Sequence, residues 1–326
     1  MRRSLGQATL AAEPVTRPLL VVAGPTASGK SALGLAVAEA LGGEIVSADA
    51  FAVYRGLDIG TDKPAPEARR RIQHHLVDIL EPTARFSAGD FSRQADTAIA
   101  DIVTRGVTPV VVGGTHFYLR ALLFGLFDGP PRDAEVRARL QQEWDSDPDG
   151  MRRRLEEVDP ASALRITAGD RQRILRALEV FELTGVPLTV HWQRQRQQLR
   201  YRPLLAAPRR ERADLYARIG ARVDMMFSQG LVAEVRGLLS AGVPSGAHAF
   251  KAIGYGEVVG YVRGHWDLDT AVARTKHASR LLAKRQLSWL RHLREGRLHW
   301  VSPVEAGGAE DLIHLWHRHL EEGGVS

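Results

Sequence analysis

The sequence contains no cysteine and no run of eighteen apolar residues. The first absence excludes disulfides, thiolate nucleophiles and thiolate zinc sites, and it fits the cytoplasmic location that we expect. The second absence excludes an ordinary membrane-spanning helix, which needs about 20 apolar residues to cross a bilayer. The longest apolar stretches, such as PLLVVAG and PVVVGG, fit buried strands instead.

Acidic residues are outnumbered by basic ones, and the formal net charge is +6. Nearly all of the basic residues are arginines, whose guanidinium groups can bind a phosphate through two parallel hydrogen bonds. This charge balance favours a polyanionic partner over a merely solvated surface.

The stretch GPTASGKS matches the phosphate-loop pattern G-x-x-x-x-G-K-[ST]. It lies between an apolar, β-prone segment, residues 18–23, and the helical pattern KSALGLAVAEAL. Backbone N–H groups at such a helix start attract anions, while the Lys30 ammonium adds a positive charge and the Ser31 hydroxyl is a predicted Mg²⁺ ligand. The predicted phosphate or pyrophosphate site comprises Gly24, Pro25, Thr26, Ala27, Ser28, Gly29, Lys30 and Ser31.

Further strands are predicted at residues 44–49, 74–79, 108–115 and 202–208, and only helices are predicted after Pro208. Alternation of strands with helical patterns predicts an α/β fold, a P-loop NTPase-like parallel sheet with helices on both faces. A charged, arginine-rich segment without strand signals predicts a helical insertion domain. We therefore expect a flexible tail at 1–17, a P-loop α/β core with C-terminal helices at 18–125 and 201–326, and an arginine-rich helical insertion at 126–200.

The predicted strand ends carry polar groups, and ligands of a parallel sheet bind beyond the carboxyl ends of its strands. Asp49 ends the second strand and is either a turn former or a general base; beside a phosphate site we favour the base. Asp58 and Asp62 are weaker candidates. The strand at 108–115 ends in Gly-Gly-Thr115, without the acidic residue that holds Mg²⁺ in ordinary P-loop NTPases. This absence argues against a kinase or ATPase.

Two helical patterns carry clusters of positive charge. Lys276, Arg280 and Lys284 recur at intervals of four residues, which places them on one side of a helix. The segment DRQRILRAL carries a second cluster, with Arg171, Arg173 and Arg176. A solvated amphipathic face and a face that follows RNA phosphates both remain open interpretations.

Six stretches together resemble one protein family. GPTASGKS, SADAFAVYRGLDIGTDKP, VGGTHFYLRALL, DRQRILRALEVFELTG, FKAIGYGEVVGY and AKRQLSWLR, in this order, are similar to bacterial tRNA dimethylallyltransferases, also called tRNA isopentenyltransferases. The resemblance covers residues 18–300. It implies transfer of a dimethylallyl group from dimethylallyl pyrophosphate to N6 of adenosine 37, next to the tRNA anticodon, with Mg²⁺ and release of pyrophosphate. The implied partners are the anticodon stem-loop of tRNA and the prenyl donor, and we expect a monomer without membrane association.

The resemblance also implies roles for individual residues. The implied catalytic residues are Asp49 as general base, Thr115 near the substrates, Arg222 on the leaving group and Lys30. The implied tRNA-binding residues are Asp49, Ala50, Phe51, Ala52, Thr115, Arg137, Gln172, Arg173, Arg176, Lys251, Gly254 and Tyr255.

Three alternatives remain. An adenylate isopentenyltransferase would prenylate free AMP or ADP and would not need the insertion or the basic C-terminal helix. A nucleotide kinase would use the same loop for ATP, and a non-enzymatic RNA-binding P-loop protein would bind tRNA without forming a product. A helical, arginine-rich insertion that clamps RNA favours the tRNA enzyme, because a stacked base must be extruded before it can react.

Overall fold

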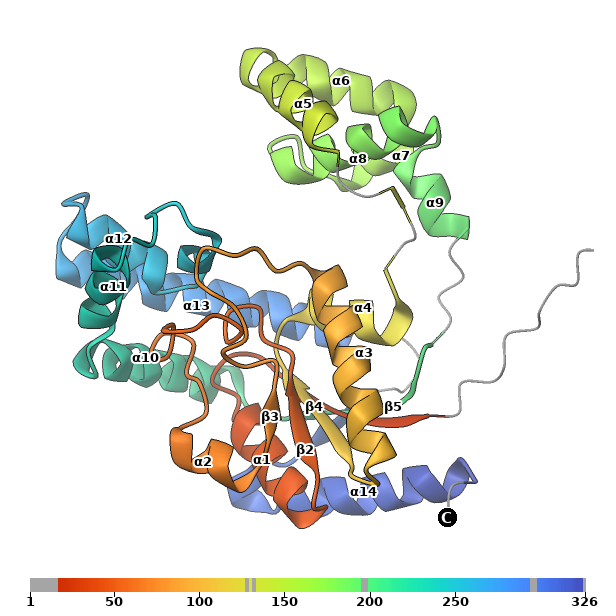
Figure 1. Cartoon of the computed structure of the whole chain (residues 1–326), viewed down its shortest axis with the longest axis vertical. Coiled ribbons are helices and arrows are strands. Elements are labelled where there is room, and N and C mark those ends of the chain that lie inside the picture. The colour runs from red at the N-terminus through yellow and green to blue at the C-terminus, as the bar shows by residue number, and fades with distance from the viewer. Residues whose placement is uncertain (1–16, 127–128, 131–132, 195–198, 294–297, 325–326) are drawn as a thin grey trace, which may run out of the picture. The chain divides into compact units, whose positions relative to one another are not determined.

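The computed structural model describes residues 17–126, 129–130, 133–194, 199–293 and 298–324 (Figure 1). Residues 1–16, nearly all of the predicted tail, lie outside this range. The chain divides into two compact units: one spans Gly125–Gln198, where the insertion was predicted at 126–200, and the other comprises the residues on either side. None of the described helices has the length and apolar content that a membrane crossing requires.

The first unit is built on a six-stranded sheet with the strand order β3-β2-β4-β1-β5-β6. Every neighbouring pair of strands is parallel, which confirms the predicted fold class. The strands are β1 (Pro18–Ala23), β2 (Glu44–Ser47), β3 (His74–His75), β4 (Pro109–Gly113), β5 (Arg202–Pro208) and β6 (Leu298–Val301).

Helices cover both faces of this sheet (Figure 1). Alternate side chains of β1 point to opposite faces: Leu20 and Val22 join one buried cluster, while Leu19 and Val21 join another. The first cluster is completed by α1 and α14, and the second by α3 and α4, among other helices. The helices of this unit are α1 (Lys30–Ala40), α2 (Pro66–Arg71), α3 (Ala88–Thr104), α4 (His116–Phe124), α10 (Arg212–Ser228), α11 (Leu231–Ser240), α12 (Tyr255–Val262), α13 (Leu268–Arg291) and α14 (Gly308–Glu322), with short 3₁₀ helices at His248–Lys251 and Val304–Ala306.

Four strands differ from the prediction; β4 ends at Gly113 instead of Thr115, and the other three differ as follows. β2 ends at Ser47, so Asp49 lies in the turn that follows it. β3 has only two residues, because Leu76 and Asp78 adopt positive φ angles of 61° and 56° that a strand cannot accommodate. The prediction of helices alone after Pro208 is wrong, since β6 adds a parallel edge strand to β5. Four residues are too few for periodicity to distinguish a strand from a helix.

The second unit is a helical bundle with an apolar core of its own. Its helices are α5 (Ala134–Ser146), α6 (Pro148–Val158), α7 (Pro160–Arg165), α8 (Arg171–Thr184) and α9 (Leu188–Arg194). Four of them start at an aspartate whose carboxylate accepts a hydrogen bond from a backbone N–H of the first turn: Asp133, Asp147, Asp159 and Asp170. Each such cap stabilises a helix by about 1 kcal/mol, so these aspartates explain where the helices begin.

Candidate functional site

A cavity of about 530 Å³ lies where the first, second and fourth strands end. Its walls come from the segments that follow β1, β2 and β4, together with side chains of α10 and α13. Lys30, Asp49 and Arg222, three of the four predicted catalytic residues, all line it. The cavity therefore joins residues that are far apart in the sequence.

The phosphate loop is shaped by two residues with positive φ, Ala27 at 63° and Gly29 at 91°. It leads directly into α1, which begins at Lys30. Among the described residues, the backbone N–H groups of Gly29, Lys30 and Ser31 have no hydrogen-bond partner. Free N–H groups at the start of a helix form an anion site, and the exposed Ser31 hydroxyl lines the same cavity.

Two arginines hold the outer side of the phosphate loop. Arg210 donates from Nε to the Ser28 carbonyl oxygen at 2.8 Å, and Arg218 donates from Nε to the Ala27 carbonyl oxygen at 3.1 Å. Both bonds use guanidinium donors, which bind more strongly than neutral ones. Each of these two carbonyl groups of the loop is therefore held by an arginine.

Arg222 brings a second positive charge to Lys30. Its Nη1 donates to Thr26 Oγ1 at 2.8 Å and lies 3.5 Å from a carboxylate oxygen of Asp62. Burial, with repulsion from Arg222, lowers the pKa of Lys30 from 10.5 to about 8, although Asp49 and Asp62 partly oppose the shift. Lys30 is thus mostly an ammonium at neutral pH, beside another cation, which is an arrangement that favours an anionic ligand.

Asp49 is both a turn former and a cavity residue. Its Oδ1 accepts hydrogen bonds from Phe51 N at 2.8 Å and from Ala52 N at 3.1 Å. No hydrogen bond from the described residues reaches its second carboxylate oxygen, which can act as a base. Thr115, the fourth predicted catalytic residue, accepts a hydrogen bond from Ala50 N at its Oγ1, 3.1 Å away. Thr115 therefore supports the turn that carries Asp49.

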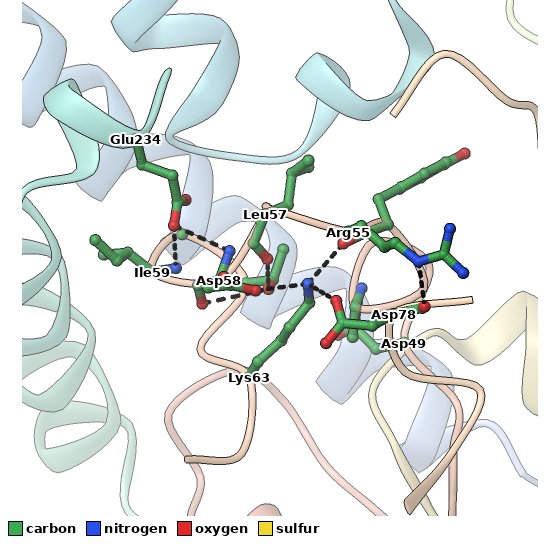
Figure 2. Close-up of polar contacts among 12 residues, drawn as sticks. Asp49, Arg55, Leu57, Asp58, Ile59, Lys63, Asp78 and Glu234 are labelled. Carbon is green, nitrogen blue, oxygen red and sulfur yellow. Dashed lines mark hydrogen bonds and ion pairs between the residues drawn. The ribbon is translucent and has the colours of Figure 1, made fainter. Parts of the chain in front are cut away.

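The segment after Asp49 has little regular structure and is held by a buried lysine (Figure 2). Lys63, whose side chain is only 2% exposed, donates to the Tyr54 carbonyl oxygen at 2.6 Å and to Asp58 at 2.8 Å, and also pairs with Asp78. Burying an ammonium costs free energy unless it is paired and hydrogen-bonded, and these three acceptors satisfy the Lys63 ammonium. Lys63 therefore fixes the path of this segment.

Glu234 of α11 holds the same segment from the other side (Figure 2). Its Oε2 accepts hydrogen bonds from Asp58 N at 3.1 Å and Ile59 N at 2.9 Å, while its Oε1 accepts one from the Tyr255 hydroxyl. Tyr255 is completely buried, and its hydroxyl also accepts from Gly60 N. Burial raises the pKa of Tyr255, which keeps the phenol neutral. The expectation that its side chain contacts tRNA is corrected, because that side chain is buried and supports the loop.

The predicted tRNA-binding residues of the second unit fall into two groups. Arg137 and Arg176 both donate to the completely buried Glu179 carboxylate, at 3.1 and 3.0 Å, and their side chains are 22% and 27% exposed. Gln172 and Arg173 are exposed at the start of α8. Glu179 thus holds two guanidinium groups that are partly exposed to solvent, while the side chains of Gln172 and Arg173 are exposed.

The remaining predicted residues lie in the first unit. Phe51, Ala52 and Lys251 line the cavity, while Gly254 is buried with a φ of 97°. On α13, Lys276 is paired with Asp224 and Arg280 lies over the Tyr216 ring, whereas the exposed Lys284 has no partner among the described residues. The positive face predicted for this helix is therefore only partly neutralised.

Sequence reasoning missed three groups at this site: Arg210, Arg218 and Gln286. Arg218 stands four residues before Arg222 on one helical pattern, which is a detectable signal. Gln286 is a polar residue at a core position of α13, three residues after the buried Ala283 and four before the buried Leu290. Arg210 precedes its helix, and no sequence pattern identifies its contact with the loop.

Fold and site together define a P-loop protein whose phosphate loop and a carboxylate line the same cavity. Among the described residues, no cluster of three or more histidine or acidic side chains could bind a metal ion by itself. A family model described as IPP transferase matches residues 52–293. The chain belongs to this family, which confirms the resemblance seen in the sequence.

Curated relatives agree with this family. The chain is 47% identical over 285 residues to tRNA dimethylallyltransferase of Geobacter metallireducens, across 87% of this chain and 92% of the relative. It is 47% identical to the Halorhodospira halophila enzyme of the same name, across 86% of this chain and 92% of the relative.

Solved structures agree as well. A tRNA isopentenylpyrophosphate transferase from Bacillus halodurans matches with a TM-score of 0.64 and 33% identity, across 93% of this chain and 99% of that one. A eukaryotic dimethylallyltransferase acting on tRNA matches with a TM-score of 0.77 and 26% identity, across 88% of this chain and 74% of that one.

The pKa of Lys30 generates a pH prediction. Because the ammonium is present below about pH 8 and lost above it, affinity for inorganic pyrophosphate should fall as the pH rises from 7 to 9.5, on the order of tenfold. Isothermal titration calorimetry measures this affinity, with Lys30→Arg as the control. The guanidinium stays charged in this pH range, so the pH slope of K30R reports the titration of pyrophosphate itself and can be subtracted from the slope of the wild type. Equal pH slopes for wild type and K30R would show that Lys30 does not titrate in this range.

Proposed function

We propose that this chain transfers the dimethylallyl group of dimethylallyl pyrophosphate to N6 of adenosine 37 in tRNA, next to the anticodon, and releases pyrophosphate. Transfer of a dimethylallyl group to tRNA follows from the family and from the named activities of its relatives. The acceptor atom and its position in the RNA are the finer part of the proposal. The observation that carries it is that Lys30, Arg222 and the Asp49 carboxylate line one cavity.

In the proposed step, the N6 lone pair attacks C1 of the donor while the bond from C1 to the pyrophosphate oxygen breaks. The electron pair of that bond leaves with the pyrophosphate, and negative charge develops there. Lys30, Arg222 and the free N–H groups of the phosphate loop would stabilise this charge as it forms. The proton of N6 passes to the second carboxylate oxygen of Asp49.

Mg²⁺ is the proposed metal, and the available donors fit it. The Ser31 hydroxyl and the carboxylates of Asp49 and Asp62, all hard oxygen donors, line the cavity. Mg²⁺ commonly takes only one or two protein ligands and completes its shell with water and substrate phosphates, so the lack of a larger acidic cluster among the described residues is compatible with it. Ser31 is the proposed ligand, and a bound metal would supply further neutralisation of the leaving group.

The RNA-binding part of the proposal assigns the anticodon stem-loop to residues of both units. Asp49, Phe51, Ala52 and Lys251 line the cavity and are proposed contacts there, where the extruded base would react. Ala50, Thr115 and Gly254, each next to a lining residue in the chain, are proposed contacts as well. Arg137, Gln172, Arg173 and Arg176 are proposed contacts in the second unit, where positive charge meets the RNA backbone. We propose further that the protein acts as a monomer in the cytoplasm.

A prenyl-transfer assay tests the function. Labelled dimethylallyl pyrophosphate and Mg²⁺ are offered in parallel with an unmodified tRNA carrying A36-A37-A38, the same tRNA with A37 replaced, and free AMP. Label on the first tRNA alone is the expected result. Label on AMP would identify an adenylate isopentenyltransferase. No label, with phosphoryl transfer from ATP instead, would make the loop a nucleotide site.

Asp49→Asn should cut turnover by on the order of 10²-fold or more, because the amide cannot accept the N6 proton. The turn should survive, since the amide oxygen still accepts the hydrogen bonds from the backbone of residues 51 and 52. Single-turnover rates are compared with Kd values for tRNA and pyrophosphate, which should change little. Weaker binding of tRNA or pyrophosphate with unchanged turnover would show that Asp49 is not the general base.

Salt dependence tests the contribution of the second unit. Arg173→Ala should lower the slope of log Kd against log salt by about one, because a phosphate contact releases about one counterion. Arg153→Ala is the matched control: it removes the same charge from the same unit at an exposed arginine that pairs with Asp147. Identical slopes for the two variants would argue that Arg173 does not contact the RNA.

A further inference from the structure

Gln286 is a polar side chain in the apolar face of α13. It is 6% exposed, and the neighbouring positions on that face, Ala283 and Leu290, are 0% and 2% exposed. Burying a carboxamide costs free energy unless its hydrogen-bonding groups find partners. Its presence at a core position therefore calls for contacts that an apolar residue could not make.

Both ends of this carboxamide are bonded to segments of the site. Thr26 N donates to Gln286 Oε1 at 2.9 Å, and Gln286 Nε2 donates to the Gly114 carbonyl oxygen at 2.8 Å. Thr26 belongs to the phosphate loop after β1, and Gly114 to the segment after β4. The last paired residues of these two strands are Ala23 and Gly113. Beyond these residues the backbones of β1 and β4 are no longer paired, and the side chain of Gln286 connects them instead.

The contact requires the backbone to approach closely. A Cβ atom at Gly114 would lie 2.5 Å from Gln286 Nε2 and 2.9 Å from the Gly24 carbonyl oxygen, so any side chain there would force the link apart. Glycine at this position is therefore explained by the carboxamide packed against it.

The link extends to the proposed base. The residue after Gly114 is Thr115, whose hydroxyl oxygen accepts from Ala50 N beside Asp49. Two side chains, Gln286 and Thr115, thus join the loops that follow β1, β4 and β2. The groups proposed to bind the leaving pyrophosphate and the group proposed to take the proton belong to one hydrogen-bonded chain.

We propose that Gln286 is a positioning residue that fixes the spacing between the phosphate loop and the Thr115–Asp49 side of the cavity, and so aligns the prenyl donor with its acceptor. The inference rests on the proposed function. Gln286 acts through the two loops, so its loss changes their spacing more than the affinity of either substrate. A displacement of about 1 Å at a reacting pair can cost on the order of 10²-fold in rate.

Gln286→Met tests the role, because methionine has a similar length and lacks both hydrogen bonds. The single-turnover rate should fall on the order of 10²-fold. Kd values for inorganic pyrophosphate and tRNA should change by less than about threefold, since both polar ends of the Gln286 carboxamide are bonded to the protein itself. Leu290→Met is the packing control on the same buried face of α13 and should keep its activity. A Q286M rate within twofold of the L290M rate would overturn the proposal.

Gln286→Glu separates alignment from folding. The introduced carboxylate can accept from Thr26 N but cannot donate to the Gly114 carbonyl, whereas the protonated carboxylic acid can do both. The rate of Q286E relative to wild type should therefore rise at least about tenfold between pH 8 and pH 5. A ratio that is independent of pH would overturn the proposal, even if Q286M fails to fold.

The wild type is assayed first. Absence of transfer to tRNA by the wild type would overturn the proposed function and this inference together. Transfer by the wild type and by Q286M alike would overturn only the role of Gln286.

Discussion

Parallel pairing brings the carboxyl ends of β1, β2 and β4 to one edge of the sheet, and the site of this protein depends on that alignment. The register pairs Ala23 with Gly113 and Ser47 with Val112, so the three strands end at nearly the same height. The tight contact between β4 and the end of β2 shows how closely they are held: a Cβ atom at Gly113 would lie 2.2 Å from the Ala48 carbonyl oxygen. The phosphate loop, the Asp49 turn and the Gly-Gly-Thr segment begin from this edge.

Burial of Lys30, together with repulsion from Arg222, shapes the anion site. The pKa of Lys30, lowered from 10.5 to about 8, corresponds to a cost of the order of 3 kcal/mol for keeping its ammonium in this environment. The folded protein bears that cost below about pH 8, and it disappears as the pH rises toward 10.5. Because an anion between Lys30 and Arg222 offsets burial and repulsion, the same arrangement that weakens the fold at neutral pH favours pyrophosphate.

Sequence reasoning found the groups that lie next to strand ends and in a known pattern. Lys30, Ser31 and Asp49 could be predicted because a phosphate loop and the end of a strand place them without reference to distant parts of the chain. β6 could not be predicted, since four residues are too few for periodicity. The strand predicted at 74–79 exists but has only two residues, because no sequence pattern indicates the positive φ angles of Leu76 and Asp78. Gln286 acts on Thr26 and Gly114, 260 and 172 residues earlier in the chain, so its role depends on tertiary contacts that no local pattern encodes.

Tyr255 shows why a family motif does not by itself separate contact from support. It belongs to a stretch that the resemblance assigns to RNA, yet its ring is buried and its hydroxyl joins Glu234 to the loop after Asp49. Lys63 closes the same loop with a nearly inaccessible ammonium. A long loop without regular structure can present a carboxylate accurately only if its polar groups are satisfied by such buried partners, because unpaired groups would favour other conformations. The residues around Asp49 are therefore constrained as strongly by this network as by the chemistry proposed for Asp49.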